Sequence, residues 1–245
     1  MHSNQYTLIY AAVLSVLTAI VLAAAAEGLK SAQEANIALE KKANILRAVR
    51  FDSPERQAIE REYREHVREM VLSAAGGELP GVRPDEVDLK EELARQPADR
   101  RLPLYVYSGK NGRSYYIIPM RGVGLWGPIW GYVSLESDFN TVYGAFFDHK
   151  GETPGLGAEI AEQPFQQQFQ GKKIRDDRQQ FVSVSVVKKT DKISVGDQHR
   201  VDAISGGTIT SRGTDAMLKN CIAPYLPYFD KISRNIAQKR RDPAL

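Results

Sequence analysis

The sequence of 245 residues predicts an α+β protein, in which a twisted, largely antiparallel sheet with flanking helices follows one N-terminal transmembrane helix. Three observations support this prediction. A long uncharged apolar run begins the chain, helical periodicity continues to about residue 73, and short β-rich segments between turn residues dominate from residue 102 onward. A doubly wound nucleotide fold is not expected, because neither a G-x-G-x-x-G turn nor a P-loop opens a helix.

The first 26 residues predict a retained membrane anchor. The run from Tyr6 to Ala26 carries no charged residue, and at about 1.5 Å per residue it spans roughly 30 Å, the thickness of a bilayer's hydrocarbon core. A cleaved signal peptide is the alternative, because the alanines at 23–26 resemble a cleavage site. We favour an anchor in the lipid bilayer, because the run exceeds an ordinary signal-peptide core and no Lys or Arg precedes it.

The next segment, residues 27–101, is predicted to be a helical membrane-proximal region and connector. Apolar residues recur at near-helical intervals over residues 27–50, so the membrane helix is expected to continue outward as an amphipathic helix. The tripeptide Ser53-Pro54-Glu55 is typical of a helix start and predicts a second helix that ends near Ser73. Residues 75–101 are rich in Gly, Pro and charge, which indicates a connector.

Residues 102–230 predict one sheet-rich domain. Two runs rich in aromatic and β-branched residues, 104–107 and 115–118, flank a Gly- and Asn-containing turn, which is a hairpin signal. The same reasoning predicts further strands at residues 129–135, 142–147, 182–186 and 199–204, and a helix at residues 159–169.

Composition excludes several functions. The net charge of +3, from 33 basic and 30 acidic residues, gives no indication of nucleic-acid binding. The single cysteine, Cys221, excludes an internal disulfide, and the four histidines are not spaced as metal ligands, so no metal site is predicted. Residues 231–245 are predicted to be a basic C-terminal tail, either solvated or in contact with lipid headgroups or a partner.

The most informative segment has the sequence DAISGGT and runs from Asp202 to Thr208. It is a turn of small residues between a predicted strand and a helix-like run, so Thr208 is expected near a helix N-terminus. Unpaired backbone N–H groups and the helix dipole favour a phosphate there, and Gly206 and Gly207 permit close backbone approach. Taken alone, the segment is also explained by a plain turn with Thr or Ser as N-cap.

Two other segments precede this motif: residues 122–131, GVGLWGPIWG, and residues 149–157, HKGETPGLG. In this order, the three segments resemble the FMN-binding domain family formed by the C subunit of the sodium-translocating NADH:quinone reductase and the G subunit of the Rnf electron-transport complex. Residues 33–46 also look like the C subunit of the reductase, so the resemblance covers nearly the whole chain. One departure is Gly207, which stands where the family usually has Ala. The missing methyl group is not expected to block modification.

The resemblance implies that FMN is joined covalently to Thr208 through a phosphoester. A separate magnesium-dependent flavin transferase performs this reaction in the family, so Thr208 is implied to be a substrate, and no catalytic residue is predicted. The implied cofactor-binding residues fall into three groups. The apolar contacts are Leu125, Trp126 and Leu156. The residues toward the polar edge of the ring are Thr153, Gly155 and Gly157, and Glu152 is implied to hold their loop. The residues around the attachment site are Asp202, Ser205, Gly206, Gly207 and Ile209.

The implied function is electron transfer within a membrane respiratory complex, a Na⁺-translocating NADH:ubiquinone reductase, in which this polypeptide is not catalytic alone. The implied partners are the other subunits of the complex, the flavin transferase and the bilayer. Two alternatives remain open. One is an electron carrier like the G subunit of the Rnf complex, and the other is an anchored extracytoplasmic binding or scaffold protein without flavin.

The predicted location is the bacterial cytoplasmic (inner) membrane, with one span and the soluble domain on the periplasmic side. This side follows the family. The positive-inside rule favours the opposite side, because Lys30, Lys41 and Lys42 follow the anchor whereas no Lys or Arg precedes it. We give the family more weight, because the charge bias depends on very few residues.

Overall fold

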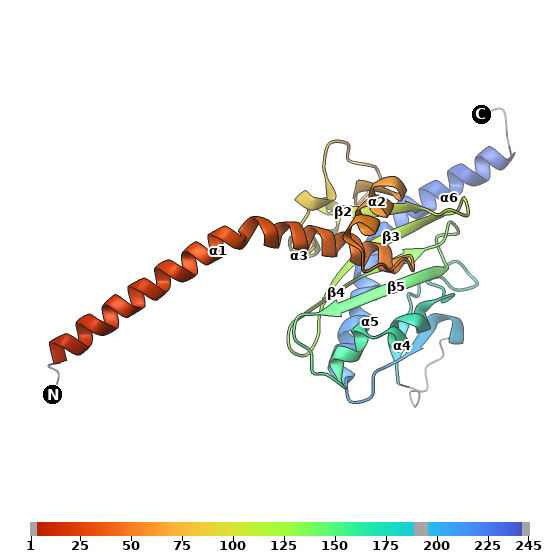
Figure 1. Ribbon diagram of the computed structural model, residues 1–245. Coiled ribbons are helices and arrows are strands. Elements are labelled where there is room, and N and C mark those ends of the chain that lie inside the picture. The colour runs from red at the N-terminus through yellow and green to blue at the C-terminus, as the bar shows by residue number, and fades with distance from the viewer. Residues whose placement is uncertain (1–3, 189–195, 242–245) are drawn as a thin grey trace. The chain divides into compact units, whose positions relative to one another are not determined.

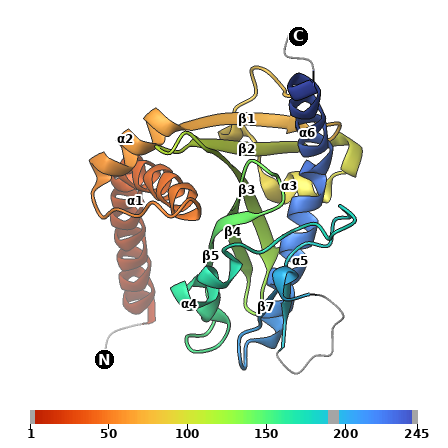
Figure 2. The same ribbon diagram turned by 90° about the vertical axis from the view of Figure 1, so that its right-hand side faces the viewer.

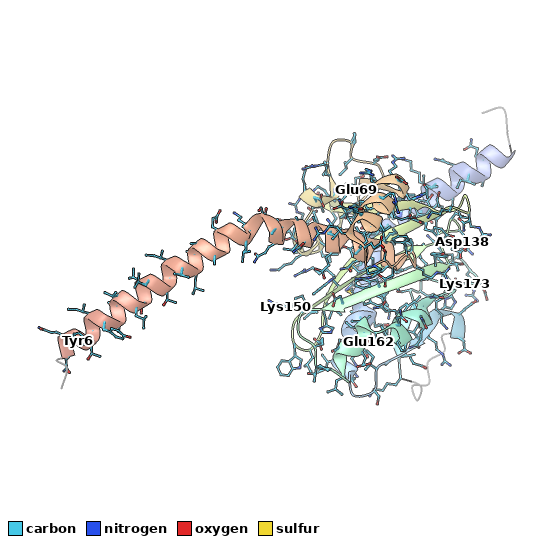
Figure 3. The ribbon with its side chains drawn as sticks, viewed as in Figure 1. Tyr6, Glu69, Asp138, Lys150, Glu162 and Lys173 are labelled. Atoms are coloured by element: carbon cyan, nitrogen blue, oxygen red, sulfur yellow. The ribbon has the colours of Figure 1, made fainter. Side chains whose placement is uncertain are left out.

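The computed structural model describes residues 4–188 and 196–241, which form two compact units, Met1–Lys41 and Lys42–Leu245. Helix α1 (Asn4–Ala48) makes up the first unit and continues into the second. It is long and apolar enough to cross a membrane. None of the residues in its apolar 18-residue stretch is buried against other parts of the protein. Figure 3 shows side chains around this helix from Tyr6 onward. The predicted helical continuation beyond residue 26 is confirmed.

The second unit is built on a five-stranded antiparallel sheet in the order β1-β2-β3-β4-β5 (Figure 1). Each strand pairs with the next one in the chain, and the predicted hairpin joins the second strand to the third. A separate parallel pair lies outside this sheet. The strands are β1 (Val67–Ser73), β2 (Arg101–Ser108), β3 (Ser114–Val123), β4 (Pro128–Leu135), β5 (Val142–His149), β6 (Ser185–Val187) and β7 (Arg200–Asp202).

Helices cover both faces of the sheet. In Figure 2, α2 lies on one side of the strands, and α5 and α6 lie on the other. The α-helices of this unit are α2 (Arg56–His66), α3 (Leu89–Ala94), α4 (Gln163–Gln166), α5 (Thr208–Ile222) and α6 (Leu226–Arg241). Short 3₁₀ turns connect them: η1 (Pro84–Glu86), η2 (Pro97–Asp99), η3 (Gly157–Ala161), η4 (Gln167–Phe169), η5 (Asp197–His199) and η6 (Ala223–Tyr225).

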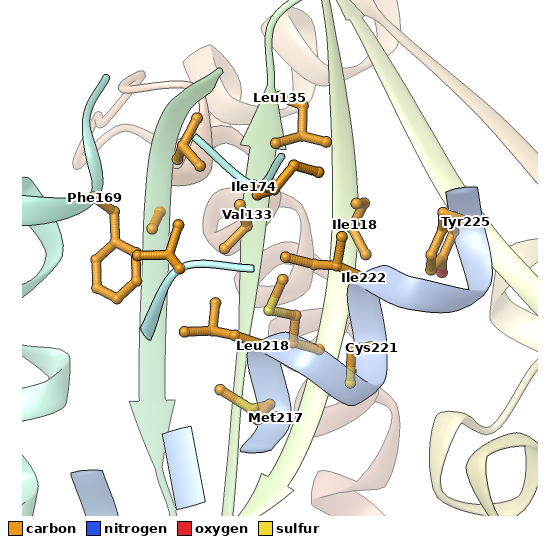
Figure 4. Packing of buried hydrophobic residues seen from close by; sticks show 14 of the residues in the cluster. Ile118, Val133, Leu135, Phe169, Ile174, Met217, Leu218, Cys221, Ile222 and Tyr225 are labelled. Atoms are coloured by element: carbon orange, nitrogen blue, oxygen red, sulfur yellow. The ribbon is translucent and has the colours of Figure 1, made fainter. Parts of the chain in front are cut away.

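The main core lies between the sheet and α5. Ile118 and Val133 of the sheet pack with Leu218 and Ile222 of α5, and all four are fully buried (Figure 4). Successive residues of a strand point to opposite faces, so only alternate residues enter this core.

The opposite face packs against the last turn of α1 and the segment that follows it. Ser134 Oγ donates a hydrogen bond of 2.6 Å to the carbonyl of Ala48. A Cβ atom on Gly144 would lie 2.5 Å from the same carbonyl oxygen, so this close approach requires glycine. The guanidinium of Arg50 stacks 3.8 Å from the ring centroid of Tyr143. These contacts fix the sheet as a layer between helices.

Two sequence predictions were wrong in detail. The second helix ends at His66, and Val67–Ser73 is a strand, because this short apolar run pairs along its length with β2. Residues 159–169 form η3, α4 and η4 rather than one helix, because Glu162 is extended and Pro164 begins a new turn. The backbone of residues 231–241, the start of the predicted basic tail, is helical as part of α6.

The strands predicted near the C-terminal half are shorter than expected. In place of the predicted strands 182–186 and 199–204, residues 185–187 and 200–202 pair as β6 and β7. The largely antiparallel α+β architecture is nevertheless confirmed.

A buried carboxylate in α3 gives a test of the fold's dependence on pH. Glu92 is 1% exposed and accepts hydrogen bonds from the backbone N and the Nε of Arg101, at 2.9 and 2.8 Å. Burial acts to raise the pKa of Glu92, but the bonds and charge of Arg101 outweigh it, so the pKa is lowered below 4.5. A lowered folded-state pKa stabilises the fold above pH 4.5, and this stabilisation is lost as the pH falls through the folded-state pKa.

We therefore expect Glu92→Gln to lower the melting temperature at pH 7, with a difference from the parent chain that shrinks as the pH is lowered below 4.5. Thermal unfolding followed by circular dichroism between pH 7 and pH 3 measures this. The exposed neighbour provides the control, Glu91→Gln, which should melt with the parent chain. A pH-independent deficit in Glu92→Gln would contradict the assignment.

Candidate functional site

Three loops meet at one end of the five-stranded sheet. The first connects β3 to β4, the second follows β5, and the third joins β7 to α5. The first two lie together because β3, β4 and β5 are antiparallel neighbours, with Val123 paired to Pro128 and Ile129 paired to His149. These loops lie within the three segments that the sequence singled out.

One buried carboxylate connects the loops. Glu152 is 5% exposed, and its Oε1 accepts a hydrogen bond of 2.8 Å from the backbone N–H of Trp126. Its Oε2 accepts a hydrogen bond of 2.6 Å from Thr210 Oγ1, in the first turn of α5. The backbone N–H of Glu152 donates to His149 Nδ1 at 3.1 Å, so the ring proton of a neutral His149 lies on Nε2. These three contacts join Glu152 to the first loop, to α5 and to the end of β5.

Glycines allow the backbone to close around this carboxylate. A Cβ atom on Gly124 would lie 2.5 Å from Glu152 Oε1, and one on Gly157 would clash with Glu152 Oε2 and Thr210 Oγ1. A Cβ on Gly213 would clash with the carbonyl of Val123, where α5 crosses the end of β3. Larger residues at these positions would push the loops apart.

Thr208 is the first residue of α5 and is half-buried. The N-cap is Gly207, which offers no side-chain acceptor to the first turn, and the carbonyl of Gly207 accepts from Ser211 N at 2.8 Å. The turn before the helix is held by Ser211 Oγ, which accepts from Ile204 N at 3.1 Å. Thr208 therefore lies at a helix N-terminus as predicted. Because Gly207 is the N-cap, neither Thr208 nor Ser205 fills that role.

Exposed apolar side chains gather around this position. Among the described residues of the second unit, six large hydrophobic side chains are exposed, and five of them lie at the end of β3, on the loops or in the first turn of α5. They are Val123, Leu125, Trp126, Leu156 and Ile209, with exposed fractions from 42% to 71%. A concentration of exposed apolar surface marks a site of ligand or partner contact.

The loop after β5 has a defined internal structure. The carbonyl of Thr153 accepts from the backbone N–H groups of Leu156 and Ala158, both at 3.1 Å, whereas the Thr153 side chain is exposed. Gly155 has a φ of +73°, and its amide donates to Glu159 Oε1 at 3.0 Å. The amide of Gly155, a residue predicted to lie toward the polar edge of the ring, is bonded within its own segment in this structure.

The attachment turn and Asp202 lie in different surroundings. Gly206 has a φ of +74°, and a Cβ there would lie 2.5 Å from Leu156 Cδ2, so the second loop touches the turn directly. Ser205 is exposed in the same turn. Asp202 lines a separate cavity of about 540 Å³, and its backbone N–H donates to Gln168 Oε1 at 2.8 Å. The structure thus places every predicted site residue on the three loops or at the start of α5, except Asp202, which lines a different cavity.

Sequence reasoning missed the residues that support the site from within. They are Thr210, Ser211, Gly124 and Gly213. One signal was available for Thr210: a carboxylate in a glycine-rich loop needs hydrogen-bond donors if it is buried, and hydroxyl residues supply them. The glycines gave no such signal, because their importance depends on which backbone atoms lie opposite.

The fold and this loop arrangement define an FMN-binding domain preceded by an apolar helix, and residues 124–223 match the FMN-binding domain family. The C subunit of the Na⁺-translocating NADH-quinone reductase from Vibrio vulnificus strain YJ016 is 32% identical, over 82% of this chain and 83% of its own length. The C subunit from Neisseria meningitidis serogroup A is 29% identical, over 95% of both chains. The chain belongs to the family formed by the C subunits of the Na⁺-translocating NADH-quinone reductases.

Solved structures agree with this assignment. The crystal structure of the C subunit from Parabacteroides distasonis has a TM-score of 0.74 and 38% identity, covering 82% of this chain and 96% of that one. Shewanella oneidensis NqrC has a TM-score of 0.65, covering 80% of this chain and 97% of its own, and at 23% identity it supports the fold alone.

The Glu152–Thr210 contact can be tested by removing one hydroxyl. In Thr210→Val, a buried carboxylate oxygen loses its donor, so we expect a loss of about 1–3 kcal/mol in the free energy of unfolding. Chemical denaturation measures this loss. The matched control is Thr153→Val in the exposed part of the loop, which should change stability by less than about 0.5 kcal/mol. Equal stability of the two variants would show that the contact does not hold the loops.

Proposed function

We propose that this chain is the electron-transferring C subunit of a Na⁺-translocating NADH:quinone reductase and that it carries FMN through a phosphoester to Thr208. The observation that carries the proposal is the setting of Thr208: a half-buried hydroxyl at an N-terminus without side-chain cap, surrounded by exposed apolar side chains. A phosphate requires hydrogen-bond donors, whereas an apolar ring requires apolar contacts. The start of α5 supplies the donors, and the exposed side chains supply the apolar contacts.

The residues present fit the cofactor. The first backbone N–H groups of α5 and the helix dipole suit a phosphate attached at Thr208. Leu125, Trp126 and Leu156 supply exposed apolar surface for a flat ring. A Cβ on Gly155 would meet no atom within 4 Å, so the loop leaves open space beside the site. Bound FMN would supply one-electron and two-electron redox chemistry.

The attachment reaction is a group transfer onto this chain. The Thr208 hydroxyl oxygen bonds to the riboflavin-proximal phosphorus of FAD, the bond to the AMP phosphate breaks, and AMP leaves while the hydroxyl gives up its proton. An alcohol is a weak nucleophile at neutral pH, so we assign activation and charge stabilisation to the metal-dependent flavin transferase. Asp202, to one side of the turn, is proposed as a contact for that transferase.

The same arrangement suits electron exchange with neighbouring subunits. The apolar side chains around Thr208 are exposed, so a partner can approach the ring closely there. The Glu152 contacts hold the loops in place, which keeps the ring's surroundings constant. We propose that α1 anchors the chain in the cytoplasmic membrane with the domain on the periplasmic side, where covalent attachment prevents loss of the cofactor.

Mass spectrometry tests the attachment residue. When the chain is co-expressed with the flavin transferase, we expect an intact mass increased by one FMN less one water, and a fluorescent band on a denaturing gel. Thr208→Ala should lose both signals, because no oxygen remains to bond phosphorus. Thr208→Ser keeps the hydroxyl and should retain flavin. Covalent flavin on Thr208→Ala would refute the assignment, and an unmodified parent chain would favour a flavin-free scaffold protein.

The unusual Gly207 gives a second test. Its φ of −95° is accessible to alanine, and a Cβ there would lie 3.0 Å from Ile204 Cγ2 and 3.3 Å from Gly157 N. We expect Gly207→Ala to load flavin fully and to lose less than about 1 kcal/mol of stability. Gly206→Ala is the contrast, because its positive φ and the Leu156 contact predict a larger loss, about 1–2 kcal/mol. Denaturation and flavin absorbance measure both properties. Failure of Gly207→Ala to load flavin would contradict the expectation.

A further inference from the structure

A second cavity lies away from the three loops. It has a volume of about 680 Å³ and is bordered by the end of β1, by α3 and η2, by β3 and by the junction of α5 with α6. Lys219, on its rim, follows Thr208 by 11 residues in α5, which is roughly 16 Å along a helix. No residue that lines this cavity belongs to the flavin site.

The lining combines positive charge with apolar surface. Three cationic side chains, Arg100, Arg121 and Lys219, face the cavity together with the amide of Asn220. The remaining lining residues are alanines, a leucine and prolines, and no carboxylate is among them. An anion would therefore meet no repulsive group on the walls.

The two arginines have no anionic partner among the described residues. Within that part of the chain, the Arg121 guanidinium has no hydrogen bond or ion pair, although the residue is half-buried. Arg100 is held by neutral acceptors, because Nη2 donates to the carbonyl of Leu93 at 2.9 Å and Nε donates to the carbonyl of Arg95 at 3.3 Å. Lys219 differs, since it pairs with Asp215 at 2.9 Å. Two partly desolvated guanidinium charges thus remain uncompensated, which is costly unless an anion binds.

Both arginines approach the same turn of α5. Cys221 Sγ donates to the carbonyl of Arg121 at 3.5 Å. Arg100 and Arg121 line the cavity together with Lys219 and Asn220, the residues of α5 that precede Cys221. Arg121 of β3 and Arg100, which immediately precedes β2, therefore border one cavity.

We propose that this cavity binds a ligand that joins a phosphate group to an apolar body. A guanidinium offers paired N–H donors that match two oxygens of a phosphate, which favours Arg100 and Arg121 as the recognition pair. Leu93 and the prolines of the wall suit the apolar body. A phospholipid headgroup region and a soluble organic phosphate share this chemistry.

Calorimetric titration of the full-length chain in a non-ionic detergent tests the proposal, with decyl phosphate, inorganic phosphate and decanol as probes. We expect one decyl phosphate to bind per chain, inorganic phosphate to bind more weakly at the same site, and decanol not to bind there. Arg121→Gln should weaken decyl phosphate binding about tenfold or more, because a charge-assisted hydrogen bond is worth that much. Arg113→Gln, the same charge change on an exposed hairpin, is the matched control.

Further variants keep the test decisive. If Arg121→Gln does not fold, Arg121→Lys replaces it. This variant keeps the charge but loses the paired donors, so it should bind decyl phosphate more weakly than the parent chain does. In nanodiscs, phosphatidic acid that competes with decyl phosphate identifies a lipid ligand, whereas unchanged affinity identifies a soluble one. Equal affinities of Arg121→Gln and Arg113→Gln, or no binding of any probe, would overturn the proposal. The outcome does not depend on whether Thr208 carries flavin.

Discussion

The hydrogen bonds of Glu152 are the interaction on which the functional end of this protein depends. One carboxylate accepts from Trp126, 26 residues away in the chain, and from Thr210, 58 residues away. A buried carboxylate is stable only if donors satisfy it, so its burial requires that the two loops and the helix start come together. The loops are rich in glycine and have few other side-chain contacts to hold them. The carboxylate thus converts three flexible segments into one defined surface.

The sheet determines where these segments can meet. A meander of five antiparallel strands returns the chain repeatedly to the same edge, and helices on both faces keep the layer rigid. Loops carried by such a scaffold can present ligand-binding groups without loss of core packing. The helix α5 has two roles in this arrangement. Its first turn presents Thr208, and its apolar side, including Leu218 and Ile222, fills the core against the sheet.

The proposed flavin site and the cationic cavity differ in whether their charged side chains have hydrogen-bond or ionic partners. At the flavin site, the carboxylate is buried and fully engaged, and the neighbouring apolar side chains are exposed. At the cavity, two guanidinium groups are partly buried with only neutral acceptors or none among the described residues. The first arrangement is complete without a ligand, whereas the second lacks a counter-charge. The two proposed sites share no residue and are separated along α5.

Much of the fold could be predicted from local patterns. The apolar N-terminal helix, the hairpin from β2 to β3 and the helix start at Thr208 follow from periodicity and turn residues. The strand β1 could not be predicted in this way. Its run of apolar residues is short, and its strand state depends on pairing with β2, which begins 28 positions after β1 ends. The segment from 159 to 169 differs for a local reason, because Glu162 is extended before Pro164 and divides the predicted helix into short turns.

The sequence by itself determined the family, the apolar helix and the position of Thr208, because these depend on residue types at fixed spacing along the chain. Only the tertiary structure decided which atoms satisfy Glu152, that the Gly155 amide is already bonded, and that Asp202 lies apart from the loops. It alone also placed Arg100 and Arg121 in one cavity. The physical reason is the same in each case. Hydrogen bonds, burial and charge compensation depend on distances between residues that are remote in the chain, and no local pattern encodes those distances.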